Sequence, residues 1–202
     1  SPPTTQASLS GPLGSHGWYT GTVTVTLTAT DPDGDSDVAA TYYTVDNGAQ
    51  QTYSSPFAVS HDAIHSLTFW SVDHAGNKET PNTQTIKIDG TAPSVTASAN
   101  PSTLTSPNGR MVTVTVSGSM SDALSGLSPA SAAFSVIDDY GTVQPSGSIS
   151  VQSNGSYSFS IQLQASRNGK DKNGRHYTIT VRALDMAGNA GSAITVVTVP
   201  HN

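Results

Sequence analysis

The sequence predicts an all-β protein built from two tandem antiparallel β-sandwiches. Three observations lead to this prediction. Segments in which apolar and polar residues alternate are frequent, Asn-Gly turn signals separate several of them, and one six-residue motif occurs in both halves. Alternation with a period of two places the apolar side chains on one face of a strand, which is typical of half-buried strands in a sandwich.

The clearest predicted strand is residues 22–27, where Val23, Val25 and Leu27 alternate with threonines and are expected to face a core. Residues 111–116 repeat the pattern with a valine at every second position. Further segments with alternation or many β-branched residues are predicted as strands: 41–45, 66–72, 83–88, 94–99, 133–136, 156–163, 177–184 and 193–199. Asn-Gly pairs favour tight turns between strands at 47–48, 108–109, 154–155 and 173–174.

The repeated motif predicts the number of domains. Residues 72–77 and 184–189 share the pattern hydrophobic-Asp-x-Ala-Gly-Asn, and each copy follows an alternating strand and precedes a final one. Residues 90–93 are predicted to form a short linker, stiffened by a proline that cannot donate a backbone hydrogen bond. We therefore predict domains at 1–90 and 91–202, each of the size of an immunoglobulin-like sandwich with about seven antiparallel strands.

The aspartates of the motif, Asp73 and Asp185, are predicted to have a structural role. An Asp where a strand meets a tight turn can accept hydrogen bonds from backbone N–H groups two residues on, and Gly with Asn tolerates left-handed backbone conformations. The predicted structural set therefore also contains the glycines and asparagines of both copies: Gly76, Asn77, Gly188 and Asn189.

Tyr177 and His65 lie at the same spacing before their motif aspartates, near the start of the penultimate strand of each domain. This is the position of the corner tyrosine of immunoglobulin-type sandwiches, whose hydroxyl ties down the preceding loop. We predict that role for Tyr177, and for His65 through a ring N–H.

The charge and composition argue against several classes of function. The net charge is −6, and the 8 Lys and Arg residues form no run, so nucleic-acid binding is not expected. The absence of cysteine excludes a disulfide framework and thiolate metal sites. No apolar stretch approaches the ~20 residues that span a bilayer, so membrane insertion is not expected. No signal peptide is recognisable, so Ser1 is expected to begin an excised fragment.

Four aspartates alternate in one short segment, at Asp31, Asp33, Asp35 and Asp37. Carboxylates this close repel one another unless a cation neutralises them. Calcium takes about six to eight oxygen ligands from flexible loops, so the segment is a candidate calcium site, although its spacing is not that of an EF-hand. Asp, Gly and Pro are also the residues that a plain turn requires, and both interpretations remain open.

A second calcium hypothesis concerns the joint between the domains. Asp89 ends the first domain, and Asp73 could lie at the same end of that sandwich. Together with a group from the second domain, these carboxylates could hold a calcium ion that stiffens the pair. No other cofactor is suggested by the sequence, and none is required.

The two tryptophans, Trp18 and Trp70, allow two interpretations. Exposed rings could stack on a sugar, as in carbohydrate-binding modules, whereas buried rings would serve packing. Both alternatives remain open at this stage.

Several segments of the first half carry a family resemblance: 17–19, 23–30, 42–48, 56–57 and 69–79. They resemble an Ig-like repeat of exported bacterial proteins and are similar to the OmpL47-type module. In the second half, residues 121–126, 139–141, 174–179 and 185–189 resemble a related bacterial Ig-like module. The resemblance implies a spacer, stalk or adhesion module within a larger secreted or cell-surface protein.

We therefore expect a non-catalytic, monomeric pair of extracellular modules, stiffened by calcium if the acidic segment binds the ion. The alternative is a carbohydrate-binding accessory module of a secreted hydrolase. The expected partners are other domains of the same parent chain, with surface glycans or proteins as further candidates. An enzyme is not predicted, because neither a Gly-x-Ser-x-Gly elbow nor a Gly-rich phosphate loop is present.

Overall fold

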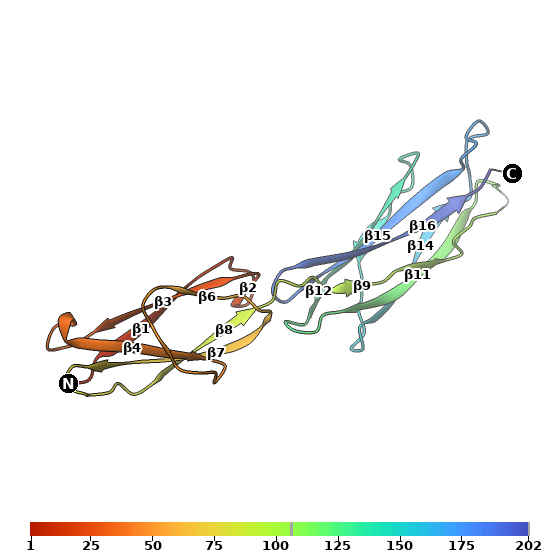
Figure 1. Ribbon diagram of the computed structural model, residues 1–202. Helices are drawn as coiled ribbons and strands as arrows, with labels where there is room; N and C mark the ends of the chain where they lie inside the picture. The colour runs from red at the N-terminus through yellow and green to blue at the C-terminus, as the bar shows by residue number, and fades with distance from the viewer. Residues whose placement is uncertain (106, 202) are drawn as a thin grey trace. The chain divides into compact units, whose positions relative to one another are not determined.

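The fold is all-β and divides into two units, as the computed structural model shows for residues 1–105 and 107–201 (Figure 1). The first unit ends at Thr91 and the second begins at Ala92, one residue beyond the predicted boundary. Apart from one short 3-10 turn, η1 (Asp35–Asp37), the regular elements of the described residues are strands. No helix in this part of the chain has the length and apolar character that a membrane crossing requires.

The first unit is a sandwich of a three-stranded and a five-stranded sheet. The smaller sheet has the order β1 (Thr4–Ser10), β3 (Val23–Thr30), β6 (Phe57–Val59). The larger sheet has the order β2 (Trp18–Tyr19), β8 (Asn82–Ile88), β7 (Ala63–Asp73), β4 (Val38–Val45), β5 (Gln51–Thr52). The chain crosses between the two sheets several times, while β4 with β5 and β7 with β8 are hairpin neighbours within the larger sheet.

The core of the first unit lies between these two sheets. Val23, Val25 and Leu27 of β3 are buried on one face, while intervening threonines of the strand are more exposed, as the alternation predicts. They belong to one cluster with buried residues of the opposite sheet, among them Leu67 and Ile86. Burial of such side chains stabilises a domain by about 25 cal/mol per Å² of apolar surface removed from water.

The second unit repeats the sandwich with its own core. One sheet has the order β10 (Ser98–Asn100), β11 (Met111–Ser121), β14 (Ser156–Gln164), and β9 (Ser94–Val95) also pairs with β11. The other has the order β13 (Ser146–Ser148), β12 (Leu127–Asp138), β15 (Arg175–Asp185), β16 (Ala190–Val199). Val114, Val116, Ile179 and Val181 are fully buried within a separate cluster. Each unit therefore has the closed core of an independent domain.

The structure differs from the predicted strands in several ways. The predicted strand 94–99 is divided into β9 and β10. β1, β2, β5, β6 and β13 were not predicted, and most of them are short strands of two or three residues. β12 begins before the predicted segment 133–136 and contains a register shift between Ser128 and Ala133. Finally, β2 pairs with β8 in parallel, so the strands of the first unit are not all antiparallel as predicted.

The separate cores lead to a prediction for Ile86→Ala. The fully buried side chain leaves a cavity in the first unit, which is expected to lower its free energy of unfolding by about 2–5 kcal/mol. Calorimetry should show one transition moved to lower temperature and the transition of the second unit unchanged. Thr85→Ala, on the exposed face of the same strand, should change neither transition. A shift of both transitions with Ile86→Ala would contradict separate cores.

Candidate cation site

The turn after β7 is built by the carboxylate of Asp73. Its Oδ1 accepts a hydrogen bond from the backbone N–H of Asn77 (2.7 Å), and its Oδ2 accepts one from Asn77 Nδ2 (2.7 Å). These hydrogen bonds, the side-chain amide foremost, hold the pKa of Asp73 below its usual value. Gly76 lies in the left-handed region at a φ of 86°, a conformation that glycine adopts at no steric cost.

The second copy of the motif forms the same turn after β15. Asp185 Oδ1 accepts hydrogen bonds from the N–H groups of Gly188 (2.6 Å) and Asn189 (2.8 Å), and Oδ2 accepts one from Asn189 Nδ2 (2.7 Å). The backbone donors thus lie three and four residues after the aspartate. Asp73 also has a backbone hydrogen bond from Ala75, so the predicted donor two residues on is present there, and the donors three and four residues on were not predicted.

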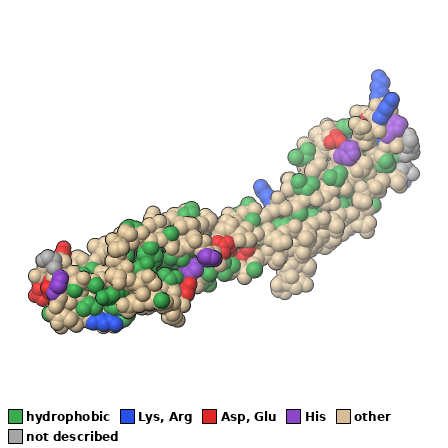
Figure 2. All heavy atoms as spheres, viewed as in Figure 1, with side chains coloured by type: hydrophobic (Ala, Val, Ile, Leu, Met, Phe, Trp, Pro, Cys, Tyr) green, Lys and Arg blue, Asp and Glu red, His purple; other side chains and the backbone are tan. Residues whose placement is uncertain are grey.

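Three carboxylates come together beside the turn of the first unit: Asp31, Asp37 and Asp73, called the acidic cluster below. One ligand oxygen from each lies within 4.8 Å of the other two. Asp31 follows the last residue of β3, and Asp37 precedes Val38, which pairs with Asp73 across β4 and β7. Figure 2 shows acidic side chains gathered at this end of the first unit. The cluster therefore joins both sheets of the sandwich at one end.

Asp31 has the most unusual environment of the three. The residue is 7% exposed, and its Oδ1 accepts a hydrogen bond from the N–H of Asp33 (2.8 Å). Its buried Oδ2 has no hydrogen-bond partner among the described residues. Buried polar atoms are nearly always satisfied by hydrogen bonds, so such an oxygen indicates a missing partner.

The other two members of the cluster differ in exposure. Asp73 is 2% exposed and held by its turn. The side chain of Asp37 is 36% exposed, and its Oδ1 lies 3.7 Å from Nδ1 of His74. That ring nitrogen also lies 2.9 Å from the backbone oxygen of Asp37. The acidic cluster can therefore be reached by solvent from the side of Asp37.

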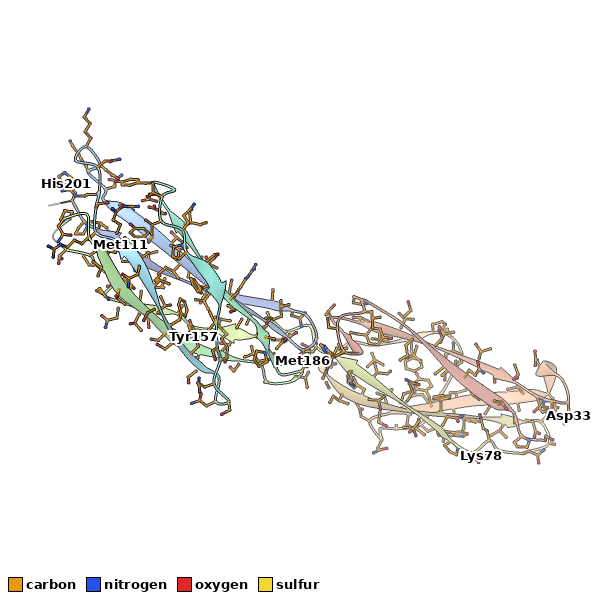
Figure 3. All side chains as sticks on the ribbon, turned by 180° about the vertical axis from the view of Figure 1, so that it is seen from behind. Asp33, Lys78, Met111, Tyr157, Met186 and His201 are labelled. Carbon is orange, nitrogen blue, oxygen red and sulfur yellow. The ribbon has the colours of Figure 1, made fainter. Side chains whose placement is uncertain are left out.

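The remaining predicted calcium ligands do not join the acidic cluster. Asp33, labelled in Figure 3, and Asp35 are exposed and lie outside the group of converging carboxylates. Alternation along 31–37 does not bring all four aspartates to one centre, because the segment is not an extended strand and ends in the 3-10 turn η1.

Asp89 is separated from Asp73 by the length of a strand. β7 and β8 are antiparallel with Ala63 opposite Ile88, so Asp89 follows β8 beside the start of β7, whereas Asp73 ends β7. The expectation that Asp73 and Asp89 share one end of the sandwich was therefore wrong. Asp89 is fully buried, and its Oδ1 accepts a hydrogen bond from the N–H of Thr91 (3.1 Å).

The second unit has a pair of carboxylates in the equivalent place. Asp122 follows β11 as Asp31 follows β3, and it offers an oxygen within 4.8 Å of one of Asp185. Asp122 Oδ1 accepts hydrogen bonds from the N–H groups of Leu124 (3.1 Å) and Gly126 (2.7 Å). The second unit therefore also has two carboxylates close together at one end, and there the loop after β11 donates hydrogen bonds to Asp122.

Tyr177 and His65 make contacts of the kind expected at the corner position. The hydroxyl of buried Tyr177 donates to the carbonyl of Gln164 (2.8 Å), at the end of the preceding strand β14. His65 places Nδ1 at 2.7 Å from Asp46 Oδ2 and Nε2 at 2.9 Å from the carbonyl of His61. Burial opposes protonation of His65, but these two acceptors outweigh it and raise its pKa.

The two tryptophans are buried, at 7% exposure for Trp18 and 9% for Trp70. The ammonium of Lys87 lies 5.6 Å from the ring centroid of Trp18, and that of Lys78 lies 4.7 Å from the ring centroid of Trp70. Both distances are within the range of a cation–π contact. Neither ring offers the open face that a sugar platform needs, so that interpretation is not supported.

Glu79, the single glutamate of the chain, holds a buried polar network that the sequence analysis missed. Its Oε1 accepts a hydrogen bond from the N–H of Thr5 (2.8 Å), and its Oε2 accepts one from the N–H of Ser71 (3.0 Å). Thr5 lies in β1 and Ser71 in β7, so Glu79 links the two sheets of the first unit. The local sequence around Glu79, a loop that continues to Pro81, does not indicate that the glutamate links the two sheets.

Arg175 and Asp138 form a buried ion pair that the sequence analysis also missed. Arg175 Nη2 donates to Asp138 Oδ2 (2.6 Å) and Nε donates to Oδ1 (2.8 Å). The guanidinium lies 4.7 Å from the ring centroids of both Tyr140 and Tyr177. Burial alone would raise the pKa of Asp138, but the hydrogen bonds from Arg175 and from backbone N–H groups lower it well below the usual range.

Comparison with known proteins identifies the family. The sequence profile of the bacterial Ig-like domain matches residues 18–90 and 95–199, one match in each unit. The chain belongs to this family. The tandem resemblance noted in the sequence is thereby confirmed.

Solved structures similar to this Ig-like pair include modules of bacterial proteins. Fibronectin(III)-like modules of CbhA from Clostridium thermocellum share 14% identity, with 97% of this chain and 95% of theirs covered and a TM-score of 0.39. The Escherichia coli adhesin FdeC shares 19% identity, with 96% of this chain and 63% of that chain covered and a TM-score of 0.48. These similarities are too low to support a functional assignment. No curated protein gives a significant match.

The buried ion pair leads to a prediction for Asp138→Asn. Loss of one partner leaves the Arg175 charge uncompensated, which is expected to lower the free energy of unfolding of the second unit by about 3–5 kcal/mol at pH 7. Because the pKa of Asp138 is lower in the folded state, its contribution is complete above its unfolded-state pKa of about 4. It is lost as the pH falls through the folded-state value.

Denaturant unfolding at several pH values tests this prediction. The stability difference between the wild type and Asp138→Asn should shrink as the pH falls below about 4. Asp139→Asn is the matched control, since that carboxylate is 46% exposed and its contact with His176 should contribute less than about 1 kcal/mol. Equal effects of the two variants would contradict the assigned role of Asp138.

Proposed function

We propose that this chain is a non-catalytic spacer or adhesion module pair within a larger secreted or cell-surface bacterial protein. Membership of the bacterial Ig-like domain family supports the proposal. The observation that carries it is topological. In both units the chain enters the sandwich at one end and leaves at the other, so that a load carried by the chain crosses the full length of each unit.

In the first unit, β1 begins at Thr4 opposite Thr30, at the end that carries the acidic cluster. The last strand, β8, ends at Ile88 opposite Ala63, which is the first residue of β7. Ala63 and Asp73 lie at opposite ends of β7, about 33 Å apart at the rise of an extended strand. Entry and exit of the chain are therefore separated by the length of the sandwich.

The second unit has the same arrangement. Ser94 of β9 pairs with Ser121, directly before Asp122 at the end near Asp185. The final strand, β16, ends at Val199 opposite Arg175, which is the first residue of β15. A tensile load on the termini would therefore run along the strands of each unit, as a spacer requires.

The buried charged groups support a structural role. Glu79 is engaged by backbone and hydroxyl donors, Asp138 is paired with Arg175, and Asp185 closes its turn. Groups held in this way stabilise loops and sheet contacts, which is the role that a spacer requires of them. We therefore retain the expectation that the pair is not an enzyme. Other domains of the parent chain are its proposed partners.

The alternative of a carbohydrate-binding accessory module predicts a different surface. Such modules present aromatic rings to the sugar, whereas both tryptophans of this chain are buried beside lysines. The spacer is therefore the function that we favour.

Single-molecule stretching by the two termini tests the proposal. Each unit should unfold in a separate event that lengthens the chain by about 30–40 nm, as expected for roughly 100 residues at about 3.6 Å each. Ile86→Ala should lower the unfolding force of one event and leave the other unchanged. A glycan array should show no specific binding. Specific capture of a polysaccharide, or stretching without resolved unfolding events, would contradict the spacer role.

A further inference from the structure

The acidic cluster places three carboxylates close together, and the ammonium group of Ser1 interacts with Asp31 and Asp73 from a greater distance. Two of its members, Asp31 and Asp73, are more than nine-tenths buried. In the described part of the chain, the ion-pair contact of these three carboxylates is the one between Asp37 and His74. Carboxylates that converge in this way repel each other, and burial increases that repulsion because it removes screening by water. A divalent cation between the three carboxylates would relieve this repulsion.

The unsatisfied oxygen of Asp31 is a second and independent observation. Oδ2 of Asp31 is the one buried side-chain nitrogen or oxygen without a hydrogen-bond partner among the described residues. Its partner atom Oδ1 already accepts the N–H of Asp33. A buried carboxylate oxygen left without a donor is costly, whereas a metal–oxygen contact would satisfy it.

We propose that Asp31, Asp37 and Asp73 form a calcium-binding site in the first unit. The proposal does not depend on the spacer role, since the site lies within one unit and is complete without a partner protein. The ion joins β3 of one sheet to β4 and β7 of the other through their carboxylates. It also fixes the loop of residues 31–37, in which Asp33 and Asp35 stay outside the coordination sphere.

The chemistry of the cluster favours calcium over other divalent ions. All three side chains offer hard oxygen ligands, which calcium and magnesium prefer and which zinc uses less often than His or Cys. Calcium–oxygen distances of about 2.3–2.6 Å place opposite ligands about 5 Å apart, so oxygens within 4.8 Å of one another fit one calcium shell. Magnesium requires metal–oxygen distances of about 2.0–2.1 Å in near-ideal octahedral geometry. Asp31 and Asp73 are held at the ends of strands and meet this requirement less easily.

The protein supplies both orientation and access. Asn77 holds both oxygens of Asp73 in place, as an outer-shell partner does for a metal ligand. Asp31 is placed by the end of β3 and by the N–H of Asp33. Asp37 is partly exposed, so water can reach the ion from this side and complete the six to eight ligands that calcium takes.

Isothermal titration of the whole chain with calcium tests the site. Asp31→Asn and Asp37→Asn should each weaken binding at one site by at least about tenfold, because calcium affinity follows the charge of the ligands. Asp35→Asn is the matched control, since it removes the same charge from an exposed position of the same loop. It should leave the affinity and the number of bound ions as in the wild type.

Two further measurements make the test decisive. Melting of each variant in the presence of a chelator shows whether it folds, and the partly exposed Asp37 provides a ligand whose replacement leaves the core intact. At one fixed calcium concentration the melting temperature of the first unit should rise equally in the wild type and in Asp35→Asn, and by clearly less in Asp37→Asn. Absence of calcium uptake by the wild type at millimolar concentration would overturn the proposal. So would unchanged binding in Asp31→Asn and Asp37→Asn, or magnesium binding as tight as that of calcium.

Discussion

The structure of each unit depends on the hydrogen bonds accepted by the carboxylate at the end of its penultimate long strand. Asp73 and Asp185 capture backbone and side-chain donors of the asparagine four residues later. A charge-assisted hydrogen bond of this kind is stronger than a neutral one, and several of them reduce the conformational freedom of the turn. This turn leads into the last strand of the unit, β8 or β16, and so sets its direction.

This turn also accounts for the acidic ends of the units. In the first unit the hydrogen bonds from Asn77 lower the pKa of Asp73, which favours a negative charge at the end of one sheet. The end of the other sheet contributes a second carboxylate, Asp31 in the first unit and Asp122 in the second. In the second unit the loop N–H groups of Leu124 and Gly126 donate hydrogen bonds to Asp122, whereas Asp31 has one buried oxygen to which no described residue donates. The two units thus share a framework and differ in how the second carboxylate is satisfied.

Much of the fold could be predicted from local pattern. Alternation in β3 and β11 and the repeated motif predict strands, core faces and two domains, because each signal lies within a few residues. β2, β5 and β13 have only two or three residues, and strand pairing with a neighbour defines them rather than their own sequence. The parallel pairing of β2 with β8 likewise depends on residues far apart in the chain.

The sequence predicts which kind of residue forms the candidate site, but it does not predict which of the aspartates come together. The alternation of aspartates drew attention to residues 31–37, and the motif drew attention to Asp73. Only the antiparallel pairing of β4 with β7 brings Asp37 to Asp73, and η1 directs Asp35 outward. The ion pair of Arg175 with Asp138 and the network of Glu79 join residues with no common local pattern, and both need the folded sandwich to be seen.

Diffraction from crystals grown with calcium tests the central claim most directly, because anomalous scattering locates the ion without reference to stability. The account predicts one peak in the first unit, within about 2.3–2.6 Å of Asp31 Oδ2 and of oxygens from Asp37 and Asp73. A water molecule at that position in saturating calcium, or carboxylates that have moved apart so that Asp31 Oδ2 gains a protein donor, would contradict it.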